Sequence, residues 1–157
     1  MRIAHCCLKG ISGHEAGRKL LAKLYHEETG TDLPKILTTE RGKPYFAGST
    51  LRFSITHTPK HAFCVLSEKN VGIDAEEADR NINLKLAQKI LSPMEKAQFD
   101  TAADQRKALL TFWVLKEAAA KLNGEGLRGY PNHTNFSLED PRVTEIDGCL
   151  VAVLEGE

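Results

Sequence analysis

The chain has 157 residues, of which 41% are hydrophobic and 27% are charged, and its formal net charge at pH 7 is zero. This composition is typical of a globular protein with one core, or with two small subdomains that share a core. A zero net charge argues against a general nucleic-acid-binding protein, which would carry an excess of basic residues. Because no apolar stretch approaches about 18 residues, we expect no membrane-spanning helix.

The N-terminal segment and the cysteines indicate a cytoplasmic protein. The first residues lack the long apolar core of a signal peptide. The cysteines are Cys6, Cys7, Cys64 and Cys149, and no two of them form a C-x-x-C pair, which argues against a zinc site. We therefore expect reduced thiols that lie in strands and are mostly buried.

The first half of the chain reads as strands with one helix. Ser12 and Glu15 have the spacing of a capping box, and Gly30 is a plausible helix terminator. Proline and glycine between residues 31 and 50 favour a loop. The expected elements are a strand over 1–8, a helix over 12–26, a short strand near 36, strands over 51–56 and 61–68, and a strand that begins at 71.

The second half reads mainly as helices. Ser92, Pro93 and Glu95 combine an N-cap, a proline at the first helical position and a capping glutamate. Thr101 and Asp104 have the same spacing and predict the start of a long helix. The expected elements are a short amphipathic segment over 84–91, helices that begin at 92 and 101, the second ending near 122, and strands over 136–138 and 149–154 around a turn near 147–148.

Two acidic clusters predict the halves of one cation site. One apolar run ends in Asp74-x-Glu76, and strand geometry turns both carboxylates to the same face. Further along, Trp113, Glu117 and Lys121 lie four positions apart, so they form one stripe of a helix. Three carboxylates could bind a hard cation such as Mg²⁺, and the lysine suits a phosphate bound to that cation. Taken alone, either cluster is more typical of a solvated ion pair, a turn or a helix cap than of a cation site.

In this order, the clusters resemble the motifs of the 4′-phosphopantetheinyl transferases, which move the phosphopantetheine arm of coenzyme A onto a serine of a carrier protein. The family pattern resembles V-G-I-D-x-E, followed after about forty residues by W/F-x-x-K-E-A-x-x-K. Here Asp74 and Glu117 are separated by 43 positions. Residues 53–58, FSITHT, resemble the family's F-N-L-S-H-S segment with Thr in place of both serines, and residues 41–44, RGKP, resemble its G-K-P segment.

The resemblance implies an α+β fold of two pseudo-symmetric subdomains, residues 1–69 and 70–157, each a small antiparallel sheet with packed helices. Coenzyme A would bind in the cleft between the subdomains. Longer members of the family carry roughly thirty more residues, some of them basic, between the first strand and the first helix. Here residues 8–12 cover that gap, and His14, Arg18 and Lys19 could supply the missing cations.

The resemblance also implies roles for individual residues. Asp74, Glu76 and Glu117 would bind Mg²⁺, and Lys121 would neutralise charge that grows on the phosphates. Glu117 is the first choice as acceptor of the serine proton, and Glu76 is the second. The residues expected to contact coenzyme A are Arg41, Lys43, Pro44, Thr56, His57 and Lys116. Without the motif, His57 reads as a hydrogen-bonded strand-end residue and Lys116 as a solvated lysine.

The expected partners are coenzyme A and an acyl or peptidyl carrier protein, and the expected assembly is a monomer with one complete site per chain. The segment 84–91 is the candidate surface for the carrier protein, although core packing explains Leu84, Ala87 and Ile90 equally well. Two other classes of function remain open. One is another Mg²⁺-dependent enzyme that cleaves phosphodiesters, such as a nuclease, and the other is a catalytically silent domain that binds coenzyme A or a carrier protein.

Overall fold

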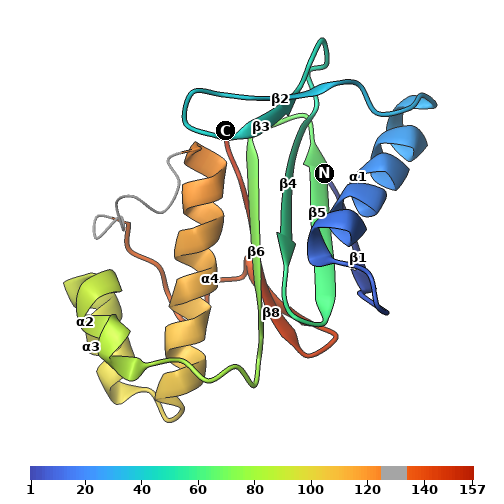
Figure 1. The fold of residues 1–157 in the computed structure, drawn as a ribbon. Helices are drawn as coiled ribbons and strands as arrows, with labels where there is room; N and C mark the ends of the chain where they lie inside the picture. The colour runs from blue at the N-terminus through green and yellow to red at the C-terminus, as the bar shows by residue number, and fades with distance from the viewer. Residues whose placement is uncertain (125–133) are drawn as a thin grey trace.

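The computed structural model describes residues 1–124 and 134–157, and it has the expected α+β class, with two small antiparallel sheets (Figure 1). The first sheet has the strand order β1-β5-β4, from β1 (Arg2–Cys7), β4 (Arg52–His57) and β5 (His61–Ser67). The second has the order β6-β8-β7, from β6 (Val71–Glu77), β7 (Val143–Ile146) and β8 (Cys149–Glu155). A hairpin of β2 (Ile36–Thr38) and β3 (Pro44–Phe46) forms a separate two-stranded sheet, and its Phe46 packs on Phe53 of the first sheet.

Two long helices flank the sheets. Helix α1 (Gly13–Thr29) begins at the predicted cap Ser12, ends at the left-handed Gly30, and packs on the first sheet. Helix α4 (Gln105–Asn123) ends at the left-handed Gly124 and packs on the second sheet. The short helices η1 (Leu84–Leu86), α2 (Ala87–Ile90) and α3 (Pro93–Thr101) lie outside α4 (Figure 1). Within the described ranges, no helix is long and apolar enough to cross a membrane.

Strand alternation divides the apolar side chains among three clusters. One lies between α1 and the first sheet, and a second lies between α4 and the second sheet. The third contains Phe63 and Val65 of β5 together with Ile73 and Ala75 of β6 and Val151 of β8, all buried. These residues face away from the helices, so the third cluster is an inter-sheet layer that joins the two halves of the chain.

Strands β4 and β6 lie side by side but belong to different sheets, and hydroxyl side chains connect them. Ser54 Oγ accepts a hydrogen bond from the backbone N–H of Ile73 at 3.2 Å. Thr56 Oγ1 donates to Asp74 Oδ1 at 3.1 Å, and Thr58 Oγ1 donates to Glu77 Oε1 at 2.6 Å. These side-chain hydrogen bonds therefore connect the two sheets, whereas backbone hydrogen bonds connect the strands within each sheet.

The prediction of a strand over 136–138 is wrong. Backbone N–H groups of this segment donate to side chains of helix α3 and not to a neighbouring strand. The N–H of Phe136 donates to Glu95 Oε1 at 3.0 Å, and the N–H of Leu138 donates to Gln98 Oε1 at 3.1 Å. Side-chain acceptors thus replace a neighbouring strand, and the sequence pattern does not reveal them. The capping box at Ser92 is confirmed, since its side chain and that of Glu95 each bond the other's backbone N–H.

The predicted start of the long helix at Thr101 is also wrong. Thr101 is the last residue of α3, and Asp104 is the N-cap of α4, accepting from the N–H of Lys107 at 2.9 Å. Strands β3 and β7 were not predicted from the sequence. The turn at Asp147 and Gly148, both with positive φ, is confirmed, and it joins β7 to β8.

The segment 84–91 was predicted to be either a docking surface or part of the core, and its residues are found in both environments. Ala87 and Ile90 of α2 are buried in the cluster around α4, whereas Leu84 is 41% exposed. Core packing therefore explains the first two residues, and Leu84 remains available to a partner.

All four cysteines are free, as expected. Cys64 and Cys149 are buried, Cys6 is half-buried and Cys7 is exposed. Burial raises the pKa of the Cys64 thiol to about 12. Burial, together with the charge of Glu77, raises the pKa of the Cys149 thiol to about 11.

Candidate functional site

A close approach between α4 and β6 brings the two acidic clusters together. A Cβ atom on Gly72 would lie 2.0 Å from the carbonyl oxygen of Ala118, so only glycine allows the helix to lie this near the strand. Asp74 and Glu76 follow Gly72 on the same face of β6, and Glu117 precedes Ala118 on α4. The backbone packing therefore fixes how the carboxylates face one another.

Asp74 is the most buried of the three carboxylates, and it is 6% exposed. Its Oδ1 atom accepts from Lys121 Nζ at 2.7 Å and from Thr56 Oγ1 at 3.1 Å. Its Oδ2 atom is buried and has no hydrogen-bond partner within the described part of the chain. Burial raises the pKa of Asp74, and the nearby Lys121 opposes that rise. A buried carboxylate oxygen without a partner is a position that suits a cation.

Glu117 lies in the field of the other two carboxylates. Burial and the charges of Asp74 and Glu76 together raise the pKa of Glu117 to about 7, against the opposing charges of Lys121 and Arg80. Crowded carboxylates of this kind favour a bound cation, because it relieves both the desolvation and the mutual repulsion. The donor set of carboxylate oxygens therefore fits a hard divalent cation.

Glu76 forms an ion pair with Arg80, and Trp113 of α4 also hydrogen-bonds its carboxylate. The Arg80 guanidinium in turn lies 6.0 Å from the centre of the Trp113 ring. Burial and the charge of Asp74 raise the pKa of Glu76, with Arg80 opposing them. Arg80 was not predicted from the sequence, although its position four residues after Glu76 was a usable signal.

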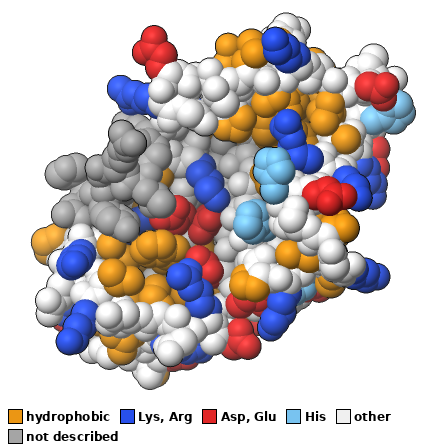
Figure 2. Space-filling model, in the orientation of Figure 1, with side chains coloured by type: hydrophobic (Ala, Val, Ile, Leu, Met, Phe, Trp, Pro, Cys, Tyr) orange, Lys and Arg blue, Asp and Glu red, His pale blue; other side chains and the backbone are white. Residues whose placement is uncertain are grey.

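A cavity of about 600 Å³ opens beside these carboxylates, between α1, the β2–β3 hairpin, β4 and the C-terminal end of α4. Figure 2 shows acidic side chains in the middle of this face, with histidines and basic side chains beside them. Most of the polar groups that line the cavity are cationic or histidine, and they are His14, Arg18, Arg41, Lys43, His57 and Lys121. The cavity thus has the electrostatic character of an anion-binding site.

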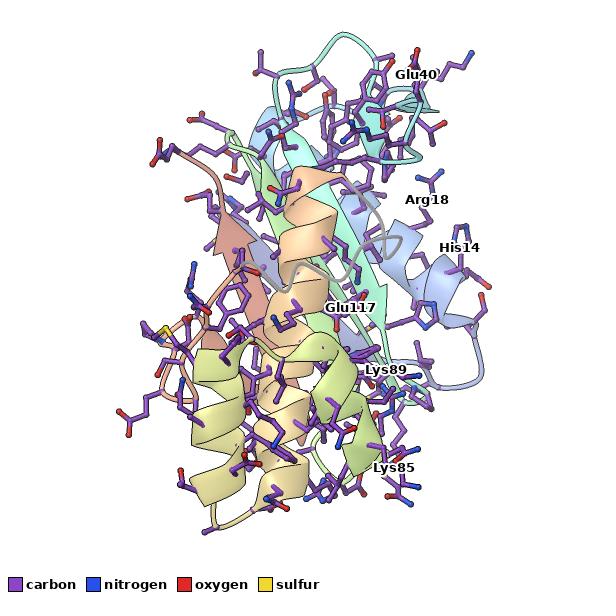
Figure 3. All side chains as sticks on the ribbon, turned by 90° about the vertical axis from the view of Figure 1, so that its left-hand side faces the viewer. His14, Arg18, Glu40, Lys85, Lys89 and Glu117 are labelled. Atoms are coloured by element: carbon purple, nitrogen blue, oxygen red, sulfur yellow. The ribbon has the colours of Figure 1, made fainter. Side chains whose placement is uncertain are left out.

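The histidine and arginine of α1 and the histidine of β4 come together because α1 packs closely on β4. A Cβ atom on Gly13 would lie 2.3 Å from Cγ of His57, so glycine is required where the first turn of α1 meets this side chain. His14 and Arg18 project from the same helix, at the right-hand side of Figure 3, and both line the cavity. Both are exposed, as is His57.

Lys43 connects the β2–β3 hairpin to the C-terminal end of α4. Its Nζ atom donates to the carbonyl oxygen of Leu122 at 2.5 Å, which satisfies a terminal carbonyl of the helix. Burial, together with the charge of Arg52, lowers the pKa of Lys43. The side chain lines the cavity, and so do the neighbouring Arg41 and Pro44.

Two of the predicted coenzyme A contacts do not line this cavity. Thr56 is buried and donates to Asp74, so in this structure it orients a carboxylate. Lys116 is 4% exposed, and its Nζ atom lies 2.8 Å from Glu95 Oε2 in a buried ion pair. That pair links α4 to the capping box of α3, and removal of one partner from such a pair is strongly destabilising.

Comparison with known proteins agrees with this geometry. A sequence model of the 4′-phosphopantetheinyl transferase superfamily matches residues 70–149, which include β6, α4 and all three carboxylates. The chain belongs to that superfamily, and the resemblance drawn from its motifs is confirmed.

Two relatives show how far the similarity extends. The chain is 35% identical over 114 residues to the 4′-phosphopantetheinyl transferase AcpT of Escherichia coli O157:H7, covering 69% of this chain and 56% of that protein. It is 28% identical over 134 residues to the 4′-phosphopantetheinyl transferase psf-1 of Bacillus pumilus, covering 82% of this chain and 57% of that protein. The chain thus spans about half the length of the relatives that it matches.

Proposed function

We propose that this protein transfers the 4′-phosphopantetheine group of coenzyme A to a serine of an acyl or peptidyl carrier protein and releases adenosine 3′,5′-bisphosphate. The observation that carries the proposal is the buried Asp74, whose Oδ2 atom has no partner among residues 1–124 and 134–157, beside a cavity lined by cations. Membership of the transferase superfamily supports the same reaction class. Together they favour this reaction over phosphodiester cleavage and over a catalytically silent domain.

Asp74, Glu76 and Glu117 are the residues that would hold Mg²⁺. When bound, the ion would neutralise negative charge on the pyrophosphate of coenzyme A. Lys121 would hold its ammonium group against Asp74, at the 2.7 Å distance found here, and would stand beside the phosphates in the cavity. Alignment and charge neutralisation are the main demands of phosphoryl transfer.

In the proposed step the serine oxygen forms a bond to the phosphorus that carries the pantetheine arm, and the pyrophosphate P–O bond breaks. The serine proton would pass to Glu117, and the leaving group would be adenosine 3′,5′-bisphosphate. Glu76 is a weaker candidate, since it is already paired with Arg80.

In the cavity, coenzyme A would contact His57, Lys43, Arg41 and Pro44. Its phosphates could also be bound by His14 and Arg18. We retain Thr56 as a positioning residue for Asp74 and leave Lys116 out of the contacts.

We also propose that residues 1–69 and 70–157 form two subdomains, that one chain holds a complete site as a monomer, and that the protein is cytoplasmic. The four free cysteines are consistent with a reducing compartment.

The direct test is intact-mass spectrometry of a panel of carrier proteins after incubation with the protein, coenzyme A and Mg²⁺. A gain of one phosphopantetheine group on a serine is the expected result. Assays for nuclease activity and for coenzyme A binding, run on the same sample, separate the alternatives. Binding without transfer across the panel would favour a silent domain, and phosphodiester cleavage without transfer would favour a nuclease.

A further inference from the structure

A second cluster of ionisable side chains lies at one end of the inter-sheet layer, and the proposed reaction does not use it. It consists of His61 at the start of β5, Glu77 at the end of β6 and Cys149 at the start of β8. All three are buried, at 8%, 8% and 0% exposure. Among the described residues, this is the only set of three His, Cys, Asp or Glu ligand atoms that all lie within 4.8 Å of one another.

Strand pairing holds this triad in place. Glu77 and Cys149 are directly opposite each other in the antiparallel pair of β6 and β8. His61 comes from the first sheet and continues the row of Phe63 and Val65, which faces the second sheet. The three ligand atoms therefore converge across the junction of the two sheets, and each is carried by a strand with a fixed register.

The distances match the edges of a small tetrahedral site. The Nδ1 atom of His61 lies 3.3 Å from Glu77 Oε1 and 3.4 Å from Cys149 Sγ. Zinc binds nitrogen and oxygen at about 2.0–2.2 Å and sulfur at about 2.3 Å in tetrahedral geometry, which places its ligand atoms roughly 3.3–3.6 Å apart. One cation can bind all three atoms at once, in place of the hydrogen bonds that join them in the metal-free protein.

The mixture of ligands selects the ion. A thiolate, an imidazole and a carboxylate together suit a borderline-soft transition metal such as Zn²⁺, whereas Mg²⁺ prefers oxygen ligands alone. The His61 and Glu77 side chains each keep 11% exposure, so an ion can reach them from solvent. Thr58, which donates to Glu77 at 2.6 Å, lies where it could orient that carboxylate.

The triad is separate from the carboxylates of the proposed active site. Alternation along β6 directs Asp74 and Glu76 toward α4, whereas Glu77 continues the row of Ile73 and Ala75 in the inter-sheet layer. A metal at the triad would thus be divided from the Mg²⁺ ligands by the strand itself. Its position suggests a structural role, because it would bridge a strand of the first sheet to two strands of the second.

We propose that His61, Glu77 and Cys149 form a structural site for a Zn²⁺-class ion that fastens the two sheets together. The ion would replace the proton of the Cys149 thiol, which would be released to solvent. The fourth position would be taken by water or by a nearby oxygen. The site does not depend on transferase activity, so it can be tested whether or not the proposed reaction is correct.

The test uses the purified protein stripped with a chelator and then titrated with ZnCl₂ in a calorimeter and with CoCl₂ in a spectrophotometer. With Mg²⁺ in excess to occupy the carboxylates of the proposed active site, we expect one Zn²⁺ or Co²⁺ ion per chain, a sulfur-to-cobalt charge-transfer band, and a thermal midpoint that rises with added Zn²⁺. The Cys149→Ser variant should lose the band and the Zn²⁺-dependent rise. The matched control is Cys64→Ser, which changes another fully buried thiol and should keep both.

The design separates a metal site from a buried hydrogen-bond network. The network alone would make Cys149→Ser less stable without any response to Zn²⁺ in the unmodified protein, and that result would overturn the proposal. Loss of the band in Cys64→Ser, or its persistence in Cys149→Ser, would overturn it too. If Cys149→Ser fails to fold, His61→Gln takes its place, and a band of unchanged intensity in that variant would count against the site.

Discussion

The two walls of the candidate site are built in different ways. The acidic wall, Asp74, Glu76 and Glu117, lies on a strand and a helix held together by the close contact at Gly72, and burial raises the pKa of each of its carboxylates. The basic wall lies on the surface of α1, on the β2–β3 hairpin and at the end of β4. Its members Arg41, His57, His14 and Arg18 are exposed.

This difference indicates what each wall contributes. Desolvated charges at fixed positions act strongly on one another and on a bound cation, so loss of one changes the whole group. Exposed cations are screened by water and salt, so each contributes a modest and partly replaceable share of binding. We therefore expect the acidic wall to control the rate of transfer and the basic wall to control the affinity for coenzyme A.

The largest effect is expected from the acidic wall. Asp74→Ala, Glu76→Ala and Glu117→Ala should each reduce transfer by about a thousandfold or more, because ligands of one ion act as a unit. The double variant Asp74→Ala/Glu117→Ala should be little slower than either single variant. The measurement is the rate of carrier-protein modification at saturating coenzyme A and Mg²⁺.

The matched control is Glu145→Ala, which removes an exposed carboxylate on β7 whose partner is Lys107. It should leave the rate unchanged. Near-normal turnover in any one of the three single variants would remove that residue from the proposed metal site.

A smaller effect is expected from the basic wall. Lys43→Ala and His57→Ala should each weaken coenzyme A binding by about tenfold, as expected for one charge-assisted contact to phosphate. The loss should shrink at high salt, and calorimetric titration measures both. Lys23→Ala is the control, because Lys23 is an exposed cation of α1 that pairs with Glu27. Unchanged affinity in both cavity variants would show that coenzyme A does not bind in this cavity.

The sequence predicted the acidic wall better than the basic wall, and the reason is local geometry. Asp74 and Glu76 share a strand, and Glu117 and Lys121 share a helix, so the periods of two and of about 3.6 residues already align them. The motif spacing then associates the two elements. Nothing in the sequence revealed that Lys121 pairs with Asp74 rather than with Glu117, because that choice depends on how close Gly72 lets the helix approach.

Contacts between distant segments were the part that sequence patterns could not supply. Lys116 belongs to the helical motif, yet its partner Glu95 lies in the capping box of another helix. Ligands of the proposed zinc site come from three separate strands, so no C-x-x-C spacing signals them. Phe136 and Leu138 looked like a strand because the pattern records apolar residues and not the acceptors of their N–H groups.

A third region, next to the acidic wall, is the candidate docking surface for the carrier protein. Lys85 and Lys89 project from η1 and α2 below Glu117, beside the exposed Leu84 (Figure 3). If this surface receives an acidic face of the carrier protein, Lys85→Glu/Lys89→Glu should raise the KM for the carrier several-fold and leave coenzyme A affinity unchanged. Steady-state kinetics with varied carrier protein measure this. Equal KM values in this variant and in the control Lys23→Glu/Lys35→Glu would exclude the surface.

Because the pKa of Glu117 is raised, replacing this residue should stabilise the folded protein at high pH, although it should reduce transfer. The carboxyl has a pKa of about 7 in the folded protein and an ordinary value of 4.5, so its contribution to stability is full below 4.5 and is lost as the pH rises through about 7. Glu117→Gln should therefore raise the thermal midpoint at pH 8 by a few degrees, with a gain that vanishes near pH 4. Mg²⁺ should stabilise the unmodified protein at pH 8 but not this variant. A thermal midpoint below that of the unmodified protein at pH 8 would contradict the proposed repulsion.

The last prediction is that mixing two inactive variants restores no activity. It tests whether the acidic wall and the basic wall belong to one chain. Thr56 bonds Asp74, and His57 and Lys121 line the same cavity, all within a single chain. A mixture of His57→Ala and Glu117→Ala proteins should consequently show no more activity than the sum of the two alone, because neither chain carries both intact walls. Light scattering on the unmodified protein should give the mass of a monomer. A stable trimer whose mixed variants regain activity would show instead that the acidic wall of one chain faces the basic wall of the next.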